Sequence, residues 1–160
     1  MRALLILIFM VLLLGACNTG RTANEEMPLV GIYSLALDSL MEEDTALNDS
    51  MTFIAVDLSN FEDLNDIDKQ GILDYFSRKY DVDVMDATFE ELREQGYFDE
   101  EIMRLDGVLL RMEKVDISTS KVVFTGSKYR SAKGAIGMEV LLRKKGDEWR
   151  VTKSKMIWIS

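Results

Sequence analysis

Residues 135–143 read AIGMEVLLR, and their apolar side chains Ile136, Met138, Val140 and Leu142 recur at every second position. Successive side chains of a β-strand point to opposite faces of a sheet, so this alternation predicts a strand with one buried face. Comparable strand-forming runs lie at residues 108–117, 121–129 and 149–159. Short connections rich in Ser, Gly and Asp separate the four runs, which predicts an antiparallel meander at the end of the chain.

The residues before this meander follow a helical period instead. Apolar side chains spaced by three or four positions predict helices at about 29–47, 66–80 and 89–95. The third helix has the clearest local signals, because Thr88 and Glu91 have the spacing of a capping box. Gly96 follows it and can adopt the left-handed conformation that ends a helix.

Two further strands are predicted between these helices. Residues 51–58 (MTFIAVDL) are apolar on both alternating faces, as in a strand covered on both sides, and residues 82–85 form a shorter candidate. The predicted fold is therefore α+β, with N-terminal helices packed on a mostly antiparallel, curved sheet of four to five strands that ends in the C-terminal meander.

The turn and strand at residues 146–151 (GDEWRV) resemble the final hairpin of NTF2-like or cystatin-like α+β domains. That resemblance covers the last third of the chain and implies helices wrapped on a curved antiparallel sheet. The strand at 51–58 and the helix after it depart from the pattern. A mixed sheet that contains a strand–helix–strand unit is an equal alternative.

The first 17 residues have the layout of an export signal. Arg2 supplies a positive start, residues 3–14 are apolar and uncharged, and two small residues precede Cys17, the only cysteine in the chain. The apolar run is about a dozen residues, too short to span roughly 30 Å of hydrocarbon as a helix.

The sequence Leu14-Gly15-Ala16-Cys17 resembles the lipobox of bacterial lipoproteins. The resemblance implies that residues 1–16 are a signal peptide that is removed, and that the Cys17 thiol carries a diacylglyceryl group. The alternative is an ordinary secretory signal followed by a chance cysteine. We expect residues 17–27, which are polar, to form a flexible tether, and residues 28–160 to form a single α+β domain on the extracytoplasmic face of the cell membrane.

The charge of the chain is unevenly distributed. Residues 17–120 carry 8 basic and 25 acidic side chains, whereas residues 121–160 carry 10 basic and 3 acidic ones. An acidic chain has no general affinity for nucleic acid or for anionic lipid, so we expect the lipid on Cys17 to provide membrane attachment. The basic end is either a solvated surface or a face that meets an anionic partner of the envelope.

The sequence has no histidine, which excludes Ser-His-Asp and Cys-His nucleophiles and zinc sites with histidine ligands. A lipidated Cys17 also removes thiolate ligands, so we expect no cofactor. Residues 66–77 resemble part of a calcium loop but have Ser77 where a bidentate Glu is needed, and an acidic first helical turn is the simpler explanation.

Two other patterns have simple explanations. Ser118 and Lys121 have Ser-x-x-Lys spacing but fall between strands, not at the start of a helix, so we interpret the match as chance. An acidic group could in principle hydrolyse a glycoside, but a solvated strand edge explains it better; its members are Asp81, Asp83, Asp86 and Glu90. Trp158 is either a core residue or an exposed contact.

Three functions remain. We favour a non-catalytic binding or interaction module that meets an envelope protein or polymer through its sheet face or its acidic helices. The alternative is a carrier with a small-ligand pocket between helices and sheet. A carboxylate-based hydrolase is the least favoured.

Overall fold

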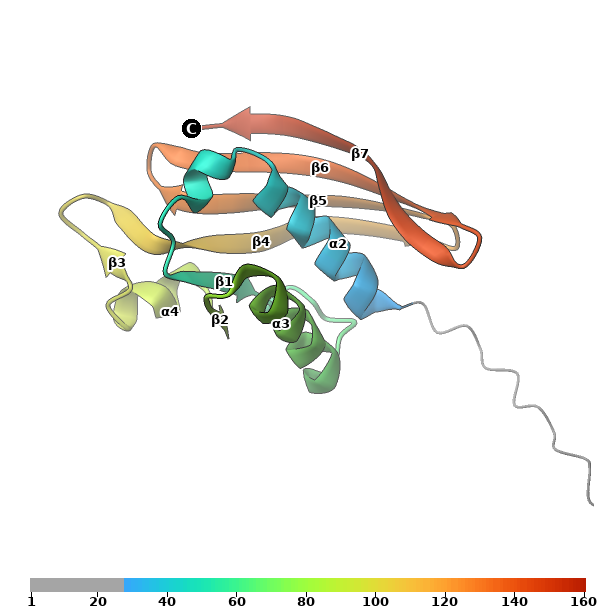
Figure 1. Ribbon diagram of the computed structural model, residues 1–160, viewed down its shortest axis with the longest axis horizontal. Helices are drawn as coiled ribbons and strands as arrows, with labels where there is room; N and C mark the ends of the chain where they lie inside the picture. Colours follow the sequence, from blue (N-terminus) through green and yellow to red (C-terminus); the bar gives the residue numbers. More distant parts are fainter. Residues whose placement is uncertain (1–27) are drawn as a thin grey trace, which may run out of the picture.

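The computed structural model describes residues 28–160; the predicted signal peptide, Cys17 and tether lie outside the described residues. The chain is α+β, as predicted (Figure 1). Its elements in order are α2 (Leu29–Glu42), the 3-10 helix η1 (Thr45–Asn48), β1 (Phe53–Asp57), α3 (Asp66–Tyr80), β2 (Asp83–Asp86), α4 (Phe89–Glu94), β3 (Phe98–Asp99), β4 (Arg104–Ser118), β5 (Lys121–Ser131), β6 (Gly134–Lys145) and β7 (Glu148–Ile159). None of the helices within residues 28–160 has the length and apolar character needed to cross a membrane.

The strands form one mixed sheet in the order β2-β1-β4-β5-β6-β7, with the two-residue β3 paired to β4. The C-terminal meander β4–β7 is antiparallel, as predicted, but β1 lies parallel to both β2 and β4. The expectation of four to five strands is wrong, since the sheet has seven. The reason is that both parallel strands of the β1-α3-β2 unit extend the four-stranded meander, and that the two-residue β3, which the sequence did not predict, pairs with β4. A mixed sheet with a strand–helix–strand unit was the equal alternative.

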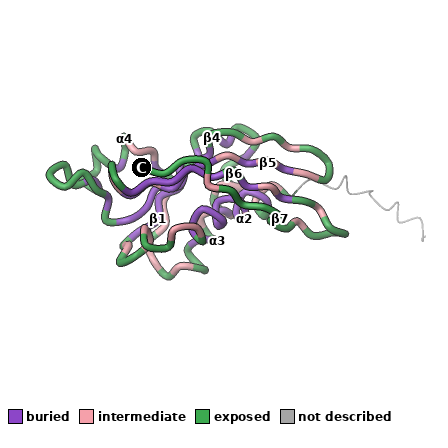
Figure 2. Tube along the Cα trace, turned by 90° about the horizontal axis from the view of Figure 1, so that it is seen from above, coloured by how far each residue is buried: buried purple, intermediate pink, exposed green. Residues whose placement is uncertain are grey.

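The helices cover the sheet unequally. Helices α2 and α3 pack on one face, and the apolar side of β6 is wholly buried there: Ile136, Met138, Val140 and Leu142 are all 0% exposed. The short α4 packs on the opposite face, near β1 and the start of β4 (Figure 2). Beyond α4, no helix within residues 28–160 covers that opposite face.

Helix α2 ends at Glu42, five residues before the predicted boundary at 47. Asp44 takes a left-handed conformation with φ 42°, which interrupts the helix before η1. The cause is a contact distant in sequence: Lys128 of β5 donates to the carbonyl oxygens of Glu43 at 2.5 Å and of Asp44 at 3.1 Å. A local helical pattern carries no information about this contact.

Helices α3 and α4 follow their predicted ranges closely. Asn65 caps α3 by accepting hydrogen bonds from the backbone of Ile67 and Asp68. The predicted capping box of α4 is present, since Thr88 Oγ1 accepts from the Glu91 amide and the Glu91 carboxylate accepts from the Thr88 amide. Local sequence signals therefore determined these two helices.

Candidate functional site

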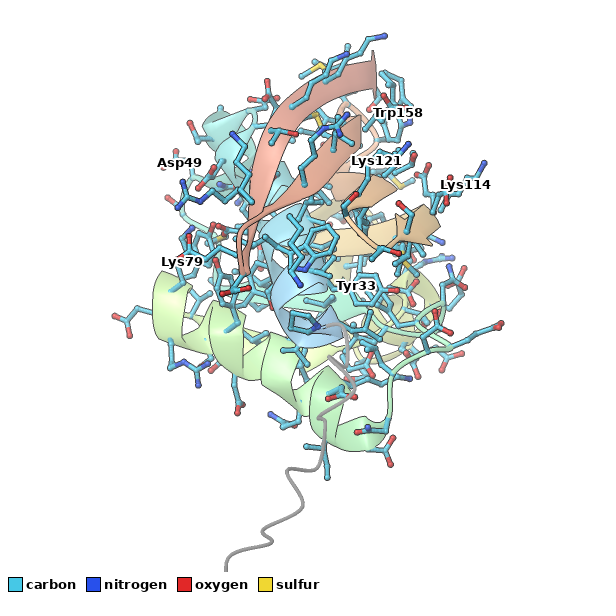
Figure 3. The ribbon with its side chains drawn as sticks, turned by 90° about the vertical axis from the view of Figure 1, so that its right-hand side faces the viewer. Tyr33, Asp49, Lys79, Lys114, Lys121 and Trp158 are labelled. Atoms are coloured by element: carbon cyan, nitrogen blue, oxygen red, sulfur yellow. The ribbon has the colours of Figure 1, made fainter. Side chains whose placement is uncertain are left out.

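The side of β4–β7 that faces away from α2 is the main uncovered surface of the sheet. Side chains that lie directly opposite one another in an antiparallel pair share a face, so the strand register assigns each residue to a side. Figure 3 shows Lys114, Lys121 and Trp158 on the side away from α2 and α3. We call this surface the open face; its residues are Leu109, Arg111, Lys114, Asp116, Lys121, Val123, Thr125, Ser127, Tyr129, Ala135, Gly137, Glu139, Leu141, Arg143, Lys153, Lys155 and Trp158.

One end of the open face holds a pocket of about 280 Å³. Three aromatic rings line it together with a guanidinium, a carboxylate and a hydroxyl. We call it the Trp158 pocket; its residues are Phe89, Leu109, Arg111, Glu113, Ser127, Tyr129 and Trp158. Aromatic walls with a few polar groups are typical of sites that bind another molecule.

Trp158 is 40% exposed although it is the largest side chain of the pocket. It lies opposite Gly137 of β6, and a Cβ built on Gly137 would fall 2.0 Å from the indole nitrogen. The glycine therefore lets the indole ring lie directly on the backbone of β6. An exposed ring held in this way loses little conformational entropy when a partner covers it.

Phe89, the first residue of α4, brings a second ring to the pocket. Its ring contacts Tyr129 edge to face, with centroids 5.4 Å apart, and Phe98 in the same manner at 5.1 Å. The capping box fixes this start of α4, and the hydrogen bond from the Thr88 amide lowers the pKa of Glu91. The pocket therefore joins α4 to β4, β5 and β7.

Arg111 supplies the positive charge of the pocket. Its Nε lies 3.5 Å from Oδ2 of the buried Asp57, while its side chain remains 48% exposed. The other Asp57 oxygen accepts from the amide and hydroxyl of Ser59 at 3.1 and 2.5 Å. Asp57 thus orients the guanidinium, which can still offer N–H groups to a carboxylate or phosphate.

The open face as a whole is basic. Six of its residues, Arg111 among them, are Lys or Arg and two are acidic, namely Asp116 and Glu139. Lys121 lies directly opposite Arg143. Arg150, which lies opposite Arg143 in β7, forms an ion pair with Glu148 at 2.6 Å. Like charges directly opposite one another destabilise a sheet, so the row formed by Lys121 and Arg143 has an energetic cost.

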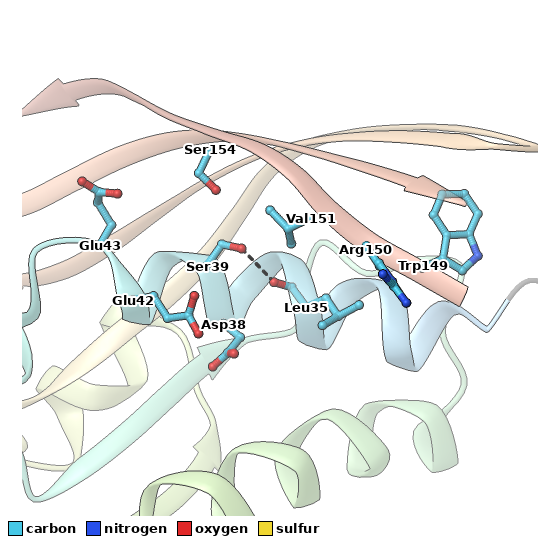
Figure 4. Close-up of a pocket in the computed structure, with 9 residues that line it drawn as sticks. All are labelled: Leu35, Asp38, Ser39, Glu42, Glu43, Trp149, Arg150, Val151 and Ser154. Carbon is cyan, nitrogen blue, oxygen red and sulfur yellow. Dashed lines mark hydrogen bonds between the residues drawn. The ribbon is translucent and has the colours of Figure 1, made fainter. Parts of the chain in front are cut away.

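A second hollow, of about 480 Å³, lies between α2 and β7 (Figure 4). It has the position expected of a carrier's pocket between helix and sheet. We call it the α2–β7 groove; its residues are Leu35, Asp38, Ser39, Glu42, Glu43, Trp149, Arg150, Val151 and Ser154. The helix side is acidic, with three carboxyl groups.

Asp38 in this groove is already fully engaged. Its carboxylate accepts hydrogen bonds from Tyr75 at 3.1 Å and Tyr80 at 2.5 Å, and it forms an ion pair with Lys79. Burial, and then the bond to Asp38, raise the pKa of Tyr80. These contacts join α2 to α3, so Asp38 has a structural task and is not a free acid or base.

Lys128 and Arg130 are buried basic residues that the sequence analysis did not single out. Lys128 is 0% exposed and, besides the two carbonyls, donates to Asn48 Oδ1 at 2.9 Å. Burial lowers its pKa to about 8, against the opposing effect of Asp44 and Glu43. Arg130 Nη1 donates to the carbonyls of Leu47 at 2.7 Å and Asp49 at 2.6 Å. The alternation of β5 assigns both residues to the side of Phe124 and could have revealed them.

The predicted acidic group is not brought to a common site. Asp86 accepts a hydrogen bond from the Leu58 amide, Asp81 follows the end of α3 in a left-handed conformation, and Glu90 lies in the first turn of α4. Asp83 is exposed in β2. Within residues 28–160 no three or more His, Cys, Asp and Glu residues are arranged to hold a metal ion.

The two remaining motifs have local roles. Asp66 and Asp68 lie in the first turn of α3, where carboxylates favour the helix dipole. Ser118 and Lys121 flank the β4–β5 turn, and the Ser118 hydroxyl donates to the Lys121 carbonyl at 2.8 Å. That bond is to the backbone, so the Ser-x-x-Lys match has no catalytic geometry. The predicted lipidation site Cys17 lies outside the described residues.

Comparisons with known proteins gave no match to a family model, to a curated protein or to a solved structure.

Proposed function

We propose that this protein is a lipid-anchored, extracytoplasmic binding module of the cell envelope, without catalytic activity, that holds its partner on the open face. The observation that carries the proposal is the Trp158 pocket, an exposed indole seated on Gly137 beside Tyr129, Phe89 and Arg111. Trp, Tyr and Arg are the side chains that contribute most of the binding energy in protein interfaces.

The surroundings of the pocket support the same function. The charged open face adjoins the aromatic pocket at its end, and interaction surfaces commonly combine an apolar patch with polar surroundings. The sign of its charge favours an anionic partner, and complementary charge raises the rate of association. Glu113 and Arg111 are the two charged side chains that line the pocket.

A small-ligand carrier is the second candidate, because the α2–β7 groove has a volume of about 480 Å³ and a mixed polar lining. A metabolite that co-purifies with the folded protein and is lost in Val151→Trp, which fills the groove, would favour the carrier. Trp158→Ala should leave such a ligand bound, because Trp158 does not line the groove.

The proposed lipid anchor depends on Cys17. Its lipobox-like surroundings imply that the thiol is acylated and that the protein lies on the outer side of the cell membrane. Cys17→Ser should remove the thiol that accepts the diacylglyceryl group. The variant should retain residues 1–16 and leave the membrane fraction. Membrane retention equal to that of the unaltered chain would contradict the anchor.

The test of the binding module is photo-crosslinking in intact cells. A photoreactive residue placed at the exposed Glu113 of the pocket should form an adduct, whereas one at the exposed Ser77 of α3 should not. Trp158→Ala should abolish the adduct at position 113 while the protein stays folded. Equal adducts from both positions, or none from position 113, would contradict the proposal.

A further inference from the structure

Strand β7 is a free edge of the sheet. It ends the strand order, and no strand within residues 28–160 pairs with its outer side. Its 12 residues, Glu148–Ile159, are almost all exposed. The outward backbone N–H and C=O groups of such an edge can accept an added strand.

The two sides of this edge carry opposite charge. On the open face, Lys153 and Lys155 lie opposite Leu141 and Glu139 of β6. On the other side the edge borders the α2–β7 groove, where Glu43 points toward the strands (Figure 4). Two other charged side chains of this groove are already paired, Glu42 with Lys79 of α3 at 3.4 Å and Arg150 with Glu148 at 2.6 Å. A strand laid beside β7 would therefore meet two lysines on one face and the carboxylate of Glu43 on the other.

Pairing of β7 with β7 of a second copy is disfavoured. A two-fold antiparallel pairing centred on Ser154 would place Lys153 of each copy opposite Lys155 of the other, on the same face. Like charges directly opposite one another cost free energy in a sheet. The lysines that disfavour a second copy in this register are the same ones that select acidic side chains.

We propose that the edge of β7 binds an extended segment of a partner protein whose side chains alternate in charge, acidic toward Lys153 and Lys155 and basic toward Glu43. This inference rests on the proposed binding function and names the class of partner. Backbone hydrogen bonds hold the segment, and alternate side chains give selectivity, because successive residues of a strand face opposite sides.

The two sites on β7 act together in this arrangement. Trp158 lies near the C-terminal end of the same strand, so a partner that follows β7 reaches the Trp158 pocket. An apolar side chain of the partner would fill the pocket while the charged segment lies along residues 150–156. The pocket then supplies affinity, and the edge fixes direction and register.

The test uses the full chain in detergent and two synthetic 12-residue peptides, the length of β7. One peptide alternates Lys and Asp along its length; the other has the same composition in two blocks, one of Lys and one of Asp. Hydrogen exchange at each backbone amide is followed by NMR. The alternating peptide should slow exchange about tenfold or more at every second amide of β7 and leave β5 unchanged. The block peptide should leave exchange unchanged in both strands.

Charge variants sharpen the test. Lys153→Glu with Lys155→Glu should weaken binding of the alternating peptide about tenfold, whereas Lys114→Glu should change it less than twofold. Lys114 is the matched control, since it belongs to the same open face at the far side of the meander, on β4. Equal affinity for the two peptides, binding without protection of β7, or no binding would each overturn the inference.

The proposed function can stand without this inference. If the adduct at position 113 in cells depends on Trp158 but the alternating peptide gives no β7 protection, the binding module remains and strand addition is wrong. If the peptide protects β7 and no adduct forms at position 113, the pocket is not the partner's anchor.

Discussion

Strand β5 contributes two lysines that lie seven residues apart and on opposite faces of the same sheet. Lys128 faces α2, is fully buried and has its ammonium group surrounded by carbonyl oxygens. Lys121 lies on the open face beside Arg143, where its charge is not neutralised by a directly opposite acid. The same strand thus stabilises the fold with one face and, in the function proposed above, would present charge to a partner with the other. Substitutions on the two faces should therefore separate stability from binding.

The largest expected effect lies on the covered face. Phe124 is 0% exposed, and Phe124→Ala should lower the free energy of unfolding by about 3–5 kcal/mol, because it leaves a cavity beneath α2. Urea denaturation measures the difference. Thr125→Ala, on the next residue and the open face, should change it by less than about 1 kcal/mol; equal losses would remove the distinction between the faces.

Trp158→Ala should weaken binding strongly and affect stability little, in contrast to Phe124→Ala. We expect it to cost about 2 kcal/mol or more of binding free energy, roughly thirtyfold in affinity for the captured partner. Its effect on unfolding should stay near 1 kcal/mol, since the indole is 40% exposed at a sheet edge. Affinity of the purified partner and urea denaturation measure the two quantities, and a loss of stability as large as that of Phe124→Ala would make Trp158 a core residue.

Lys128→Met should destabilise the protein by about 1–3 kcal/mol at neutral pH, because the partly buried carbonyls of Glu43 and Asp44 lose their donor. Its effect should also depend on pH. The pKa of Lys128 is about 8 in the folded protein and 10.5 ordinarily, so the unfolded chain holds more protons between these values. Stability that depends on this group therefore rises with pH over that range.

The free energy of unfolding of the unaltered protein minus that of Lys128→Met should therefore increase from pH 8 to pH 10.5. Titrating tyrosines and Lys79 are common to both proteins and cancel in the comparison. A difference that stays constant or shrinks with rising pH would contradict the lowered pKa of Lys128.

The smallest effect is expected in the cation row. Arg143 lies directly opposite Lys121, so Arg143→Thr should raise the free energy of unfolding by a few tenths of a kcal/mol. The gain should disappear near 0.5 M salt, where the Debye length is about 4 Å. Glu139→Thr, which removes a carboxylate opposite Lys155, should instead lower stability; a loss with Arg143→Thr would show that the row is not repulsive.

The sequence predicted what depends on local pattern. The alternation of β6 and the caps of α3 and α4 are confirmed because neighbouring residues determine them. The end of α2 was wrong because Lys128, 84 or more residues away, binds the carbonyls of Glu43 and Asp44 directly after the helix. The strand count was wrong because β1, β2 and the two-residue β3 all join the four-stranded meander.

The candidate site was less predictable than the fold. Trp158 could be singled out, but not its burial state, because Gly137 and the register of β6 with β7 decide it. Phe89, Arg111 and Tyr129 belong to three other elements and meet Trp158 only in the folded chain. The basic charge of residues 121–160 was visible in the sequence, yet the division between a buried Lys128 and an exposed face required the structure.

The central claim is that the open face is covered by a partner in the cell envelope while α3 is not. Amine-reactive labelling of intact cells, compared residue by residue with the purified protein, tests it most directly. We predict that Lys114, Lys121, Lys153 and Lys155 react several times more slowly in cells, whereas Lys69 of α3 reacts equally in both samples. Unchanged reactivity of the open-face lysines in cells, or equal protection of Lys69, would contradict the claim.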